Sequence, residues 1–287
     1  MHSAHLKYKL TFYLLCAILI MKLGEGKPTT NQKGIFMEYA LILDTETTGL
    51  DKCFCYDCSW VIIDKADGHV VDFKANIVEQ IWHNLPLFES AYYKEKRKKY
   101  IDMMRKHDAV MDKWGYIMRK LKQDIKKYSI SEVYAYNSDF DDKVISYNCA
   151  WFKCNNPLET IPIYDIWGYA SEFITCNSDY RQFCETNSRF TDTGNYKGSA
   201  EVVYQFLIAN PDFVEEHMGV FDSEIEAAIL YQCILRGAKW GYSYSVNKVL
   251  TRPVLHPFTI KVDGVEVLKG EYLKKYIRSD VYNFKSK

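Results

Sequence analysis

Residues 40–50, ALILDTETTGL, decide what can be inferred about the fold and the chemistry of this chain. Residues 39–43 form a short apolar run that is typical of a buried strand. Asp44 and Glu46 stand two apart at the end of this run, so both side chains project from the same face of the strand, with Thr45 turned away. Two adjacent anions repel each other unless a cation or a proton compensates, and a bound cation is the simpler interpretation.

The segments around this strand predict a mixed α/β domain. Two further strands at hairpin-like spacing, joined by Asp67-Gly68, make an antiparallel meander with the first. Strands and helices then alternate, which predicts a mixed sheet with helices on both faces. The expected strands are 39–43, 59–64, 70–77, 132–136 and 161–164, and the expected helices are 110–128, 141–152 and several from 166 to 236.

A second acidic motif lies in residues 133–145, VYAYNSDFDDKVI, where an apolar strand leads into a helix. Asp141 is the candidate ligand here, because the apolar residues on either side of it should fix the turn against the core. Asp139 and Asp142 are expected to face solvent. One of these carboxylates could instead be only a helix N-cap.

A third motif lies in residues 213–237, FVEEHMGVFDSEIEAAILYQCILRG. Asp222 opens an apolar helix, and His217 lies five positions before it. A helix packed under the sheet could bring Asp222 to the same cation while His217 overhangs the pocket. Taken alone, this spacing is more typical of a surface histidine followed by a capping aspartate.

In this order the three motifs resemble the DEDDh exonucleases of the ribonuclease H-like superfamily, and most of all the bacteriophage-encoded relatives of the proofreading subunit of DNA polymerase III. The resemblance covers roughly residues 37–237. It implies a mixed five-stranded sheet of order 3-2-1-4-5 with the second strand antiparallel. Tyr136 stands where relatives often carry a histidine, and residues 218–221 also depart from the usual pattern.

The resemblance also implies a site and a reaction. It predicts a 3′-to-5′ exonuclease that uses two Mg²⁺ or Mn²⁺ ions and releases nucleoside 5′-monophosphates, with roles in DNA replication and proofreading. Its substrate would be the single-stranded 3′ end of DNA, with RNA as the alternative, and a DNA polymerase is a candidate partner. The implied metal ligands are Asp44, Glu46, Asp141 and Asp222, the general base is His217, and Thr47, Thr48 and Asn137 would contact the substrate.

The chemistry of the residues is consistent with this reaction. Hard divalent cations prefer oxygen ligands, so four carboxylates suit Mg²⁺ or Mn²⁺ rather than Zn²⁺. An unperturbed imidazole titrates near pH 6.5, and His217 would therefore be neutral above about pH 7. Two alternatives stay open: an inactive nucleic-acid-binding or polymerase-associated protein on the same fold, and another enzyme with paired carboxylates, such as a glycoside hydrolase.

Composition bounds the class of protein. The chain has 287 residues, of which 48% are hydrophobic, and a formal net charge of zero, so disorder and a strong non-specific attraction to nucleic acid are not indicated. Residues 94–127 nevertheless hold 13 basic and five acidic side chains. This stretch is either a solvated helix face or a phosphate-steering patch beside an acidic pocket.

The nine cysteines include a cluster at Cys53, Cys55 and Cys58. This cluster is expected to be a loop with reduced cysteines rather than a zinc site, because a fourth ligand is missing.

The ends of the chain are expected to lie outside the enzymatic domain. Residues 1–36 contain a twelve-residue, mostly apolar run, which is either an export signal or an upstream extension with Met37 as the working start. A cytoplasmic location without stable membrane association is expected. Residues 238–287 form a C-terminal extension with a predicted hairpin, 258–262 and 265–268, around Asp263-Gly264.

Overall fold

The computed structural model describes residues 37–246, 255–262 and 265–273. The extension expected at residues 1–36 lies outside the described residues, and the division of the chain into three parts stays a prediction. Within the described ranges, no helix is both long enough and apolar enough to cross a membrane.

The predicted mixed sheet is confirmed, with additions at one edge. The strands are β1 (Tyr39–Thr47), β2 (Cys55–Asp64), β3 (Val70–Lys74), β4 (Asn76–Val78), β5 (Val110–Asp112), β6 (Val133–Ala135) and β7 (Ile163–Asp165). β1 pairs with β2 antiparallel and with β6 parallel, β6 pairs with β7 parallel, and β3 pairs with β2 antiparallel. These five strands have the predicted order 3-2-1-4-5 with an antiparallel second strand. β4 and β5 continue the sheet beside β2, which makes seven strands.

Three details of the predicted secondary structure were wrong. The segment 70–77 is not one strand, because β3 ends at Lys74 and β4 begins at Asn76. Val110 belongs to the edge strand β5 and not to the following helix. The cysteine cluster is not a loop: Cys55 and Cys58 lie within β2, and all ten residues of this strand are buried.

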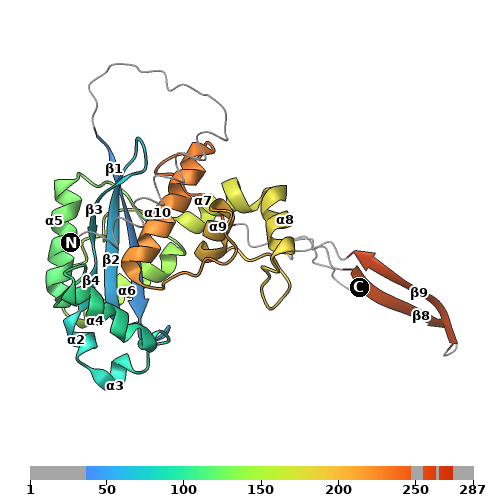
Figure 1. Cartoon of the computed structure of the whole chain (residues 1–287), viewed down its shortest axis with the longest axis horizontal. Coiled ribbons are helices and arrows are strands. Elements are labelled where there is room, and N and C mark those ends of the chain that lie inside the picture. Colours follow the sequence, from blue (N-terminus) through green and yellow to red (C-terminus); the bar gives the residue numbers. More distant parts are fainter. Residues whose placement is uncertain (1–36, 247–254, 263–264, 274–287) are drawn as a thin grey trace, which may run out of the picture.

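The helices are α2 (Glu79–Trp82), α3 (Leu85–Phe88), α4 (Arg97–Arg105), α5 (Trp114–Lys127), α6 (Ser138–Trp151), α7 (Ile166–Ala170), α8 (Ser178–Thr186), α9 (Ala200–Leu207) and α10 (Gly219–Leu235), with a 3₁₀ turn η1 (Lys94–Lys96) and a π turn η2 (Ser171–Thr175). Figure 1 shows α5 and α10 on opposite sides of the sheet.

Hydrogen bonds across the layers define the two faces. Asp124 of α5 accepts from the indole of Trp60, which pairs with Leu43 and shares its face of the sheet. Asp141 of α6 accepts from Thr45, two residues along β1 on the same face. The N-terminus of α10 bonds to the opposite face of β2. The sheet is therefore covered by α5 and α6 on one side and by α10 on the other, as the sequence predicts.

β2 reads as a continuous buried strand because both of its faces are covered. Trp60, Val61, Ile62 and Ile63 are all fully buried. A strand between two helical layers has no solvent face, so its sequence does not alternate between apolar and polar residues.

The predicted C-terminal hairpin is confirmed in its strands. β8 (Leu255–Val262) and β9 (Val265–Leu273) pair antiparallel and are longer than expected. The turn at residues 263–264 lies outside the described residues.

Candidate active site

β1 presents two carboxylates to one cleft. In the register of β1 with β2, Asp44 lies opposite Ser59 and Glu46 lies opposite Asp57, so these four side chains share the face that α10 covers. Asp44 and Glu46 are partly buried at the carboxyl end of the strand. The strand continues to Thr47, beyond the apolar run, which keeps both side chains on the same face.

α6 delivers Asp141 to the same place from the opposite layer. Asp141 is only 2% exposed and lies in the first turn of the helix. Its Oδ1 accepts a 2.7 Å hydrogen bond from the hydroxyl of Thr45. Val144 and Ile145, one turn further on, are fully buried and fix the helix against the sheet. Asp139 and Asp142 are exposed, as predicted.

The start of α10 is fixed against β2 by a buried aspartate. Asp57, which is 2% exposed, accepts hydrogen bonds from the backbone N–H of Gly219 at 2.9 Å and from the hydroxyl of Tyr100 at 2.8 Å. A Cβ atom at Gly219 would lie 2.9 Å from Oδ1 of Asp57, so the helix can approach β2 this closely only with glycine. This contact sets the position of Asp222, which lies three residues later and is 4% exposed.

One cleft of about 650 Å³ gathers the five predicted catalytic side chains. The lining includes all four predicted metal ligands and the predicted general base: Asp44, Glu46, Asp141, Asp222 and His217. Ligand atoms of Glu46, His217 and Asp222 lie within 4.8 Å of one another. The three sequence motifs thus meet in one cavity, although up to 178 positions separate them along the chain, from Asp44 to Asp222.

In the absence of a cation, burial and mutual repulsion disfavour the ionised form of the carboxyl groups in the cleft. Burial, followed by repulsion from Glu226, Asp141 and other carboxylates, raises the pKa of Asp44 well above its usual range. Burial and repulsion from Glu215 do the same to the pKa of Asp222. Burial raises the pKa of Asp141 to about 7, against hydrogen bonds from Thr45 that lower it.

Two carboxylate oxygens in this cluster lack a hydrogen-bond partner within the part of the chain that the structure describes. Among the described residues, no group donates a hydrogen bond to the buried Oδ2 of Asp44 or to the buried Oδ1 of Asp222. A buried acceptor without a partner costs about 1–3 kcal/mol, and more if it is charged. Unpartnered carboxylate oxygens beside further carboxylates are the donor set that hard divalent cations prefer, so the residues present fit Mg²⁺ or Mn²⁺.

His217 lies on the segment that leads into α10. Its backbone has a φ of 48°, and its side chain remains 33% exposed. The imidazole stacks on the ring of Tyr93, with centroids 4.3 Å apart and planes inclined by 14°. Burial, together with the positive charge of Lys96, lowers the pKa of His217 below its usual range. The neutral imidazole that can accept a proton is therefore favoured.

The predicted substrate-binding residues divide between two locations. Thr47 and Thr48 line the cleft. Asn137 does not belong to the lining: it adopts a left-handed conformation (φ 63°) before α6, and its side chain is exposed. Its backbone N–H donates to Oδ1 of Asp165 at 2.9 Å, so its observed contact shapes the turn that precedes Asp141.

Sequence reasoning missed further acidic groups at the cleft. Glu226 is 4% exposed, lines the cleft and accepts from the backbone N–H of Tyr136 at 3.1 Å. It lies four residues after Asp222 on α10, a helical spacing that could have identified it. Glu215 also lines the cleft, and burial raises its pKa to about 7.

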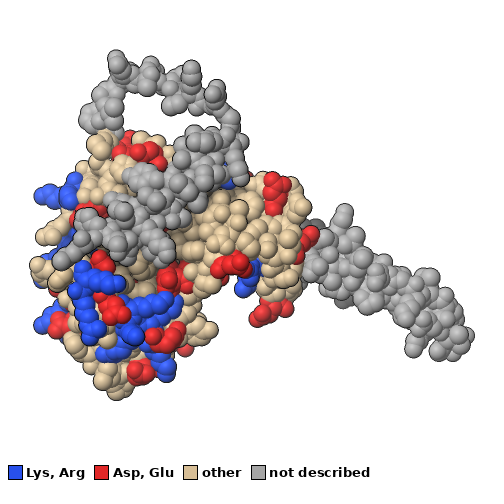
Figure 2. All heavy atoms as spheres, viewed as in Figure 1, with Lys and Arg blue, Asp and Glu red and all other residues tan. Residues whose placement is uncertain are grey.

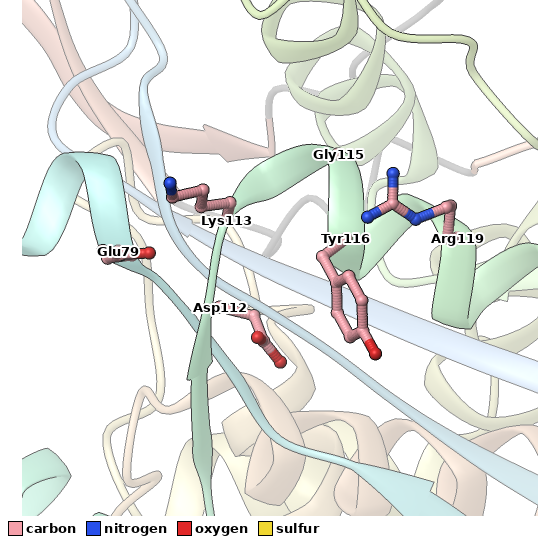
Figure 3. A pocket seen from close by; sticks show the side chains of 6 residues that line it. All are labelled: Glu79, Asp112, Lys113, Gly115, Tyr116 and Arg119. Atoms are coloured by element: carbon pink, nitrogen blue, oxygen red, sulfur yellow. The ribbon is translucent and has the colours of Figure 1, made fainter.

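Another hollow and another acidic group differ from this cleft in chemistry. A hollow of about 400 Å³ lies where β5 leads into α5, and Figure 3 shows its lining: Glu79, Asp112, Lys113, Gly115, Tyr116 and Arg119. Mixed charges line it. Asp64, Asp67 and His69 also come together, around the turn between β2 and β3. There Asp67 accepts from the backbone N–H of His69 at 3.0 Å, which accounts for the group as part of a turn.

No family model and no curated protein matches the sequence. Solved structures do resemble the fold at low identity. The nuclease domain of 3′hExo, a DEDDh family member bound to rAMP, aligns with a TM-score of 0.47 and 11% identity over 70% of this chain and 94% of that domain. A 3′-exonuclease solved in a study of histone mRNA stem-loop recognition aligns with a TM-score of 0.43 and 9% identity over 96% of both chains.

E. coli exonuclease I in complex with a dA16 oligonucleotide aligns with a TM-score of 0.42 and 12% identity over 70% of this chain. The chain spans only 41% of that protein's length.

Proposed function

We propose that this chain is a metal-dependent 3′-to-5′ exonuclease that releases nucleoside 5′-monophosphates from nucleic acid. One observation carries the proposal: four carboxylates and a histidine from three distant segments line one cleft, where two buried carboxylate oxygens lack a donor among the described residues. Four ionised carboxylates this close together repel one another, and a bound cation compensates this repulsion.

Asp44, Glu46, Asp141 and Asp222 would hold the divalent cations, with two Mg²⁺ or Mn²⁺ ions expected. When bound there, such ions would lower the pKa of a coordinated water molecule and neutralise negative charge on the phosphate oxygens. Thr45 fixes the carboxylate of Asp141 through its hydroxyl. The contact of Gly219 with Asp57 fixes the helix that carries Asp222.

His217 would act as the general base. It takes a proton from the attacking water, the water oxygen forms a bond to phosphorus, and the bond between phosphorus and the 3′ oxygen breaks. The released 3′ oxygen takes up a proton from solvent water and the imidazolium of His217 returns its proton to solvent, which leaves a shortened strand with a 3′ hydroxyl and a nucleoside 5′-monophosphate. The lowered pKa of His217 supports this role, because the imidazole is then neutral at physiological pH.

The cleft favours an unpaired end of a strand as substrate. Thr47 and Thr48 border the carboxylates and would contact the terminal nucleotide. Tyr92, 84% exposed at the rim of the cleft, offers a flat face on which a base can stack. We favour DNA as substrate, with RNA as the alternative, and a DNA polymerase as a partner remains a prediction.

The test is cleavage of labelled oligonucleotides by the full chain with Mg²⁺ or Mn²⁺. We expect a 3′-labelled single strand to lose its label as a mononucleotide, and a 5′-labelled strand to shorten stepwise. EDTA and Asp44→Ala should abolish both changes, and His217→Ala should lower turnover while leaving Mn²⁺ binding intact. Matched DNA and RNA strands with recessed, blunt and protruding ends would define the substrate.

An intact 3′-labelled strand across a pH series with Mn²⁺ would contradict the proposal. Retained affinity for the strand would then identify an inactive nucleic-acid-binding protein on the same fold.

A further inference from the structure

The segment that carries His217 needs support from outside itself. With a φ of 48°, His217 occupies the left-handed region, which is unfavourable for a non-glycine residue and persists only where the surroundings determine it. Residues 212–218 lie outside helices and strands, so no ladder of backbone hydrogen bonds holds them. The imidazole therefore depends on side-chain contacts for its position. Within the segment, Nδ1 of His217 lies 3.7 Å from Oε2 of Glu215, and Glu201 of α9 accepts from the backbone N–H of Glu215 at 3.1 Å.

Further contacts, at His217 itself and at the residue before it, come from a basic segment more than 110 residues earlier in the chain. The ring of Tyr93 stacks on the imidazole of His217 at 4.3 Å. The ammonium of Lys96 donates to the backbone carbonyl of Glu216, and the ammonium of Lys99 pairs with the Glu216 carboxylate. We call the three side chains Tyr93, Lys96 and Lys99 the clamp, since together they contact His217 and the residue before it.

The contacts within the clamp support one another. The Lys96 ammonium lies 4.5 Å from the centre of the Tyr93 ring, so the cation and the aromatic face attract each other. Tyr100, one residue beyond the clamp, is fixed by its hydrogen bond to the buried Asp57. Asp57 also holds the first residue of α10 through the N–H of Gly219. The clamp and the helix after His217 are thus anchored to the same carboxylate.

A solvated basic surface explains only part of this segment. Figure 2 shows Lys and Arg side chains gathered over α4, and an exposed ion pair such as Lys99 with Glu216 contributes little stability. Lys96 differs because it is partly buried and donates to a backbone oxygen, which orders the chain directly before His217. Tyr93 differs because its flat contact sets the plane of the imidazole.

We propose that the clamp positions His217 for proton transfer, with Tyr93 as the principal positioning residue and Lys96 holding the backbone. The inference rests on the proposed function for its effect on catalysis, whereas the placement of the imidazole can be measured independently. A base displaced by about 1 Å can lose as much as 100-fold in rate, so the clamp should act on kcat far more than on KM.

Substitutions of Tyr93 test the stack. Tyr93→Phe keeps the ring and should retain kcat within about threefold, whereas Tyr93→Leu keeps apolar volume without a flat ring and should lower kcat by about tenfold or more. Lys96→Ala should also lower kcat. Lys98→Ala removes an equal charge from an exposed side chain of α4 and should leave kcat unchanged.

A double-mutant cycle separates positioning from a general structural role. If Tyr93 acts through the imidazole, Tyr93→Leu should have no further effect on kcat in the His217→Ala background. An equal loss of kcat in both backgrounds would overturn the proposal, as would a native kcat for Tyr93→Leu.

NMR of the histidine ring protons provides a readout that needs no activity. His217→Ala identifies the His217 signal, and a ring-current shift should be present in the native protein and Tyr93→Phe and lost in Tyr93→Leu. If the shift behaves this way and the chain cleaves no nucleic acid, the proposed function fails and the placement by the clamp stands. If the chain cleaves nucleic acid and the shift is absent, the clamp is refuted.

Discussion

The hydroxyl of Thr45 donates a 2.7 Å hydrogen bond to Oδ1 of Asp141, and this contact joins two of the three acidic motifs. Thr45 is the residue between Asp44 and Glu46, and the alternation of the strand turns it toward the layer of α6. It is therefore not a spacer: it holds the third carboxylate of the cleft relative to the first two.

Thr45→Val should weaken metal binding without unfolding the protein. The substitution keeps the shape of the side chain and removes the donor to Asp141, and loss of such a support for a ligand typically costs about 10- to 100-fold in metal affinity or activity. Thr45→Ser keeps the hydroxyl and should bind Mn²⁺ like the native chain. Calorimetric titration with Mn²⁺ measures the difference, and equal affinity for Thr45→Val and the native chain would refute the role assigned to this hydroxyl.

The metal-free protein should lose stability as the pH rises from about 5 to 8. Burial raises the pKa of Asp57 to about 6, of Asp141 to about 7 and of Glu215 to about 7, and it also raises the pKa of Asp44 and Asp222. The folded state binds more protons than the unfolded state between the usual and the raised pKa values, so the free energy of unfolding falls across this window.

The opposite contributions are smaller. The lowered pKa of His217 makes the folded state gain stability as the pH rises, but it is one group against several carboxylates. The pKa of Asp72, lowered to about 2, acts below about pH 4. Thermal unfolding in EDTA should therefore show a falling midpoint, and Mn²⁺ should raise the midpoint more at pH 8 than at pH 5. A midpoint that rises with pH in EDTA would contradict this description of the cleft.

Asp44→Asn should stabilise the metal-free protein at pH 8 and abolish its stabilisation by Mn²⁺. The amide removes a charge that burial, Glu226 and Asp141 all disfavour, and it also removes a predicted metal ligand. Asp142→Asn is the matched control, because Asp142 is exposed on α6 and should affect neither property. Unfolding midpoints with and without Mn²⁺ decide the outcome, and a native-like Mn²⁺ shift for Asp44→Asn would count against Asp44 as a ligand.

Gly219→Ala should destabilise the fold by about 1–3 kcal/mol, the usual cost of an added methyl group in a close contact. The new Cβ would meet Oδ1 of Asp57 at 2.9 Å and Cβ of Ser59 at 3.0 Å. In Gly115→Ala the nearest atom lies at 3.8 Å, so that variant should be neutral or slightly stabilising. Urea unfolding compares the two, and equal stabilities would show that the approach of α10 to β2 tolerates a side chain.

Local patterns predicted the individual strands, helices and candidate side chains, whereas the strand order and the convergence of the motifs were implied by the resemblance to the DEDDh exonucleases. An apolar run marks β1, and its alternation places Asp44 and Glu46 on one face. The apolar residues beyond Asp222 mark the buried helix α10. Glu226 lies four residues after Asp222, which places both side chains on one face of α10, and this helical spacing was overlooked.

The remaining features depend on contacts that no local pattern encodes. β4 and β5 have three residues each, which is too few to show the alternation of a strand. Val110 was assigned to the following helix because its spacing from the next apolar residues is helical. The start of β2 looked like a loop because its cysteines and Asp57 do not alternate with apolar residues, which follows from burial of both faces. The contacts of Lys96 with Glu216 and of Tyr93 with His217 span about 120 residues and can be seen only in the folded chain.

The central claim is that carboxylates from β1, α6 and α10 form one metal centre. Anomalous diffraction from crystals of the full chain grown with Mn²⁺ locates the ions directly. We expect Mn²⁺ peaks in the cleft within bonding distance of Asp44, Glu46, Asp141 and Asp222. Occupied Mn²⁺ sites elsewhere, for example at Asp64, Asp67 and His69, together with no peak in this cleft, would contradict it.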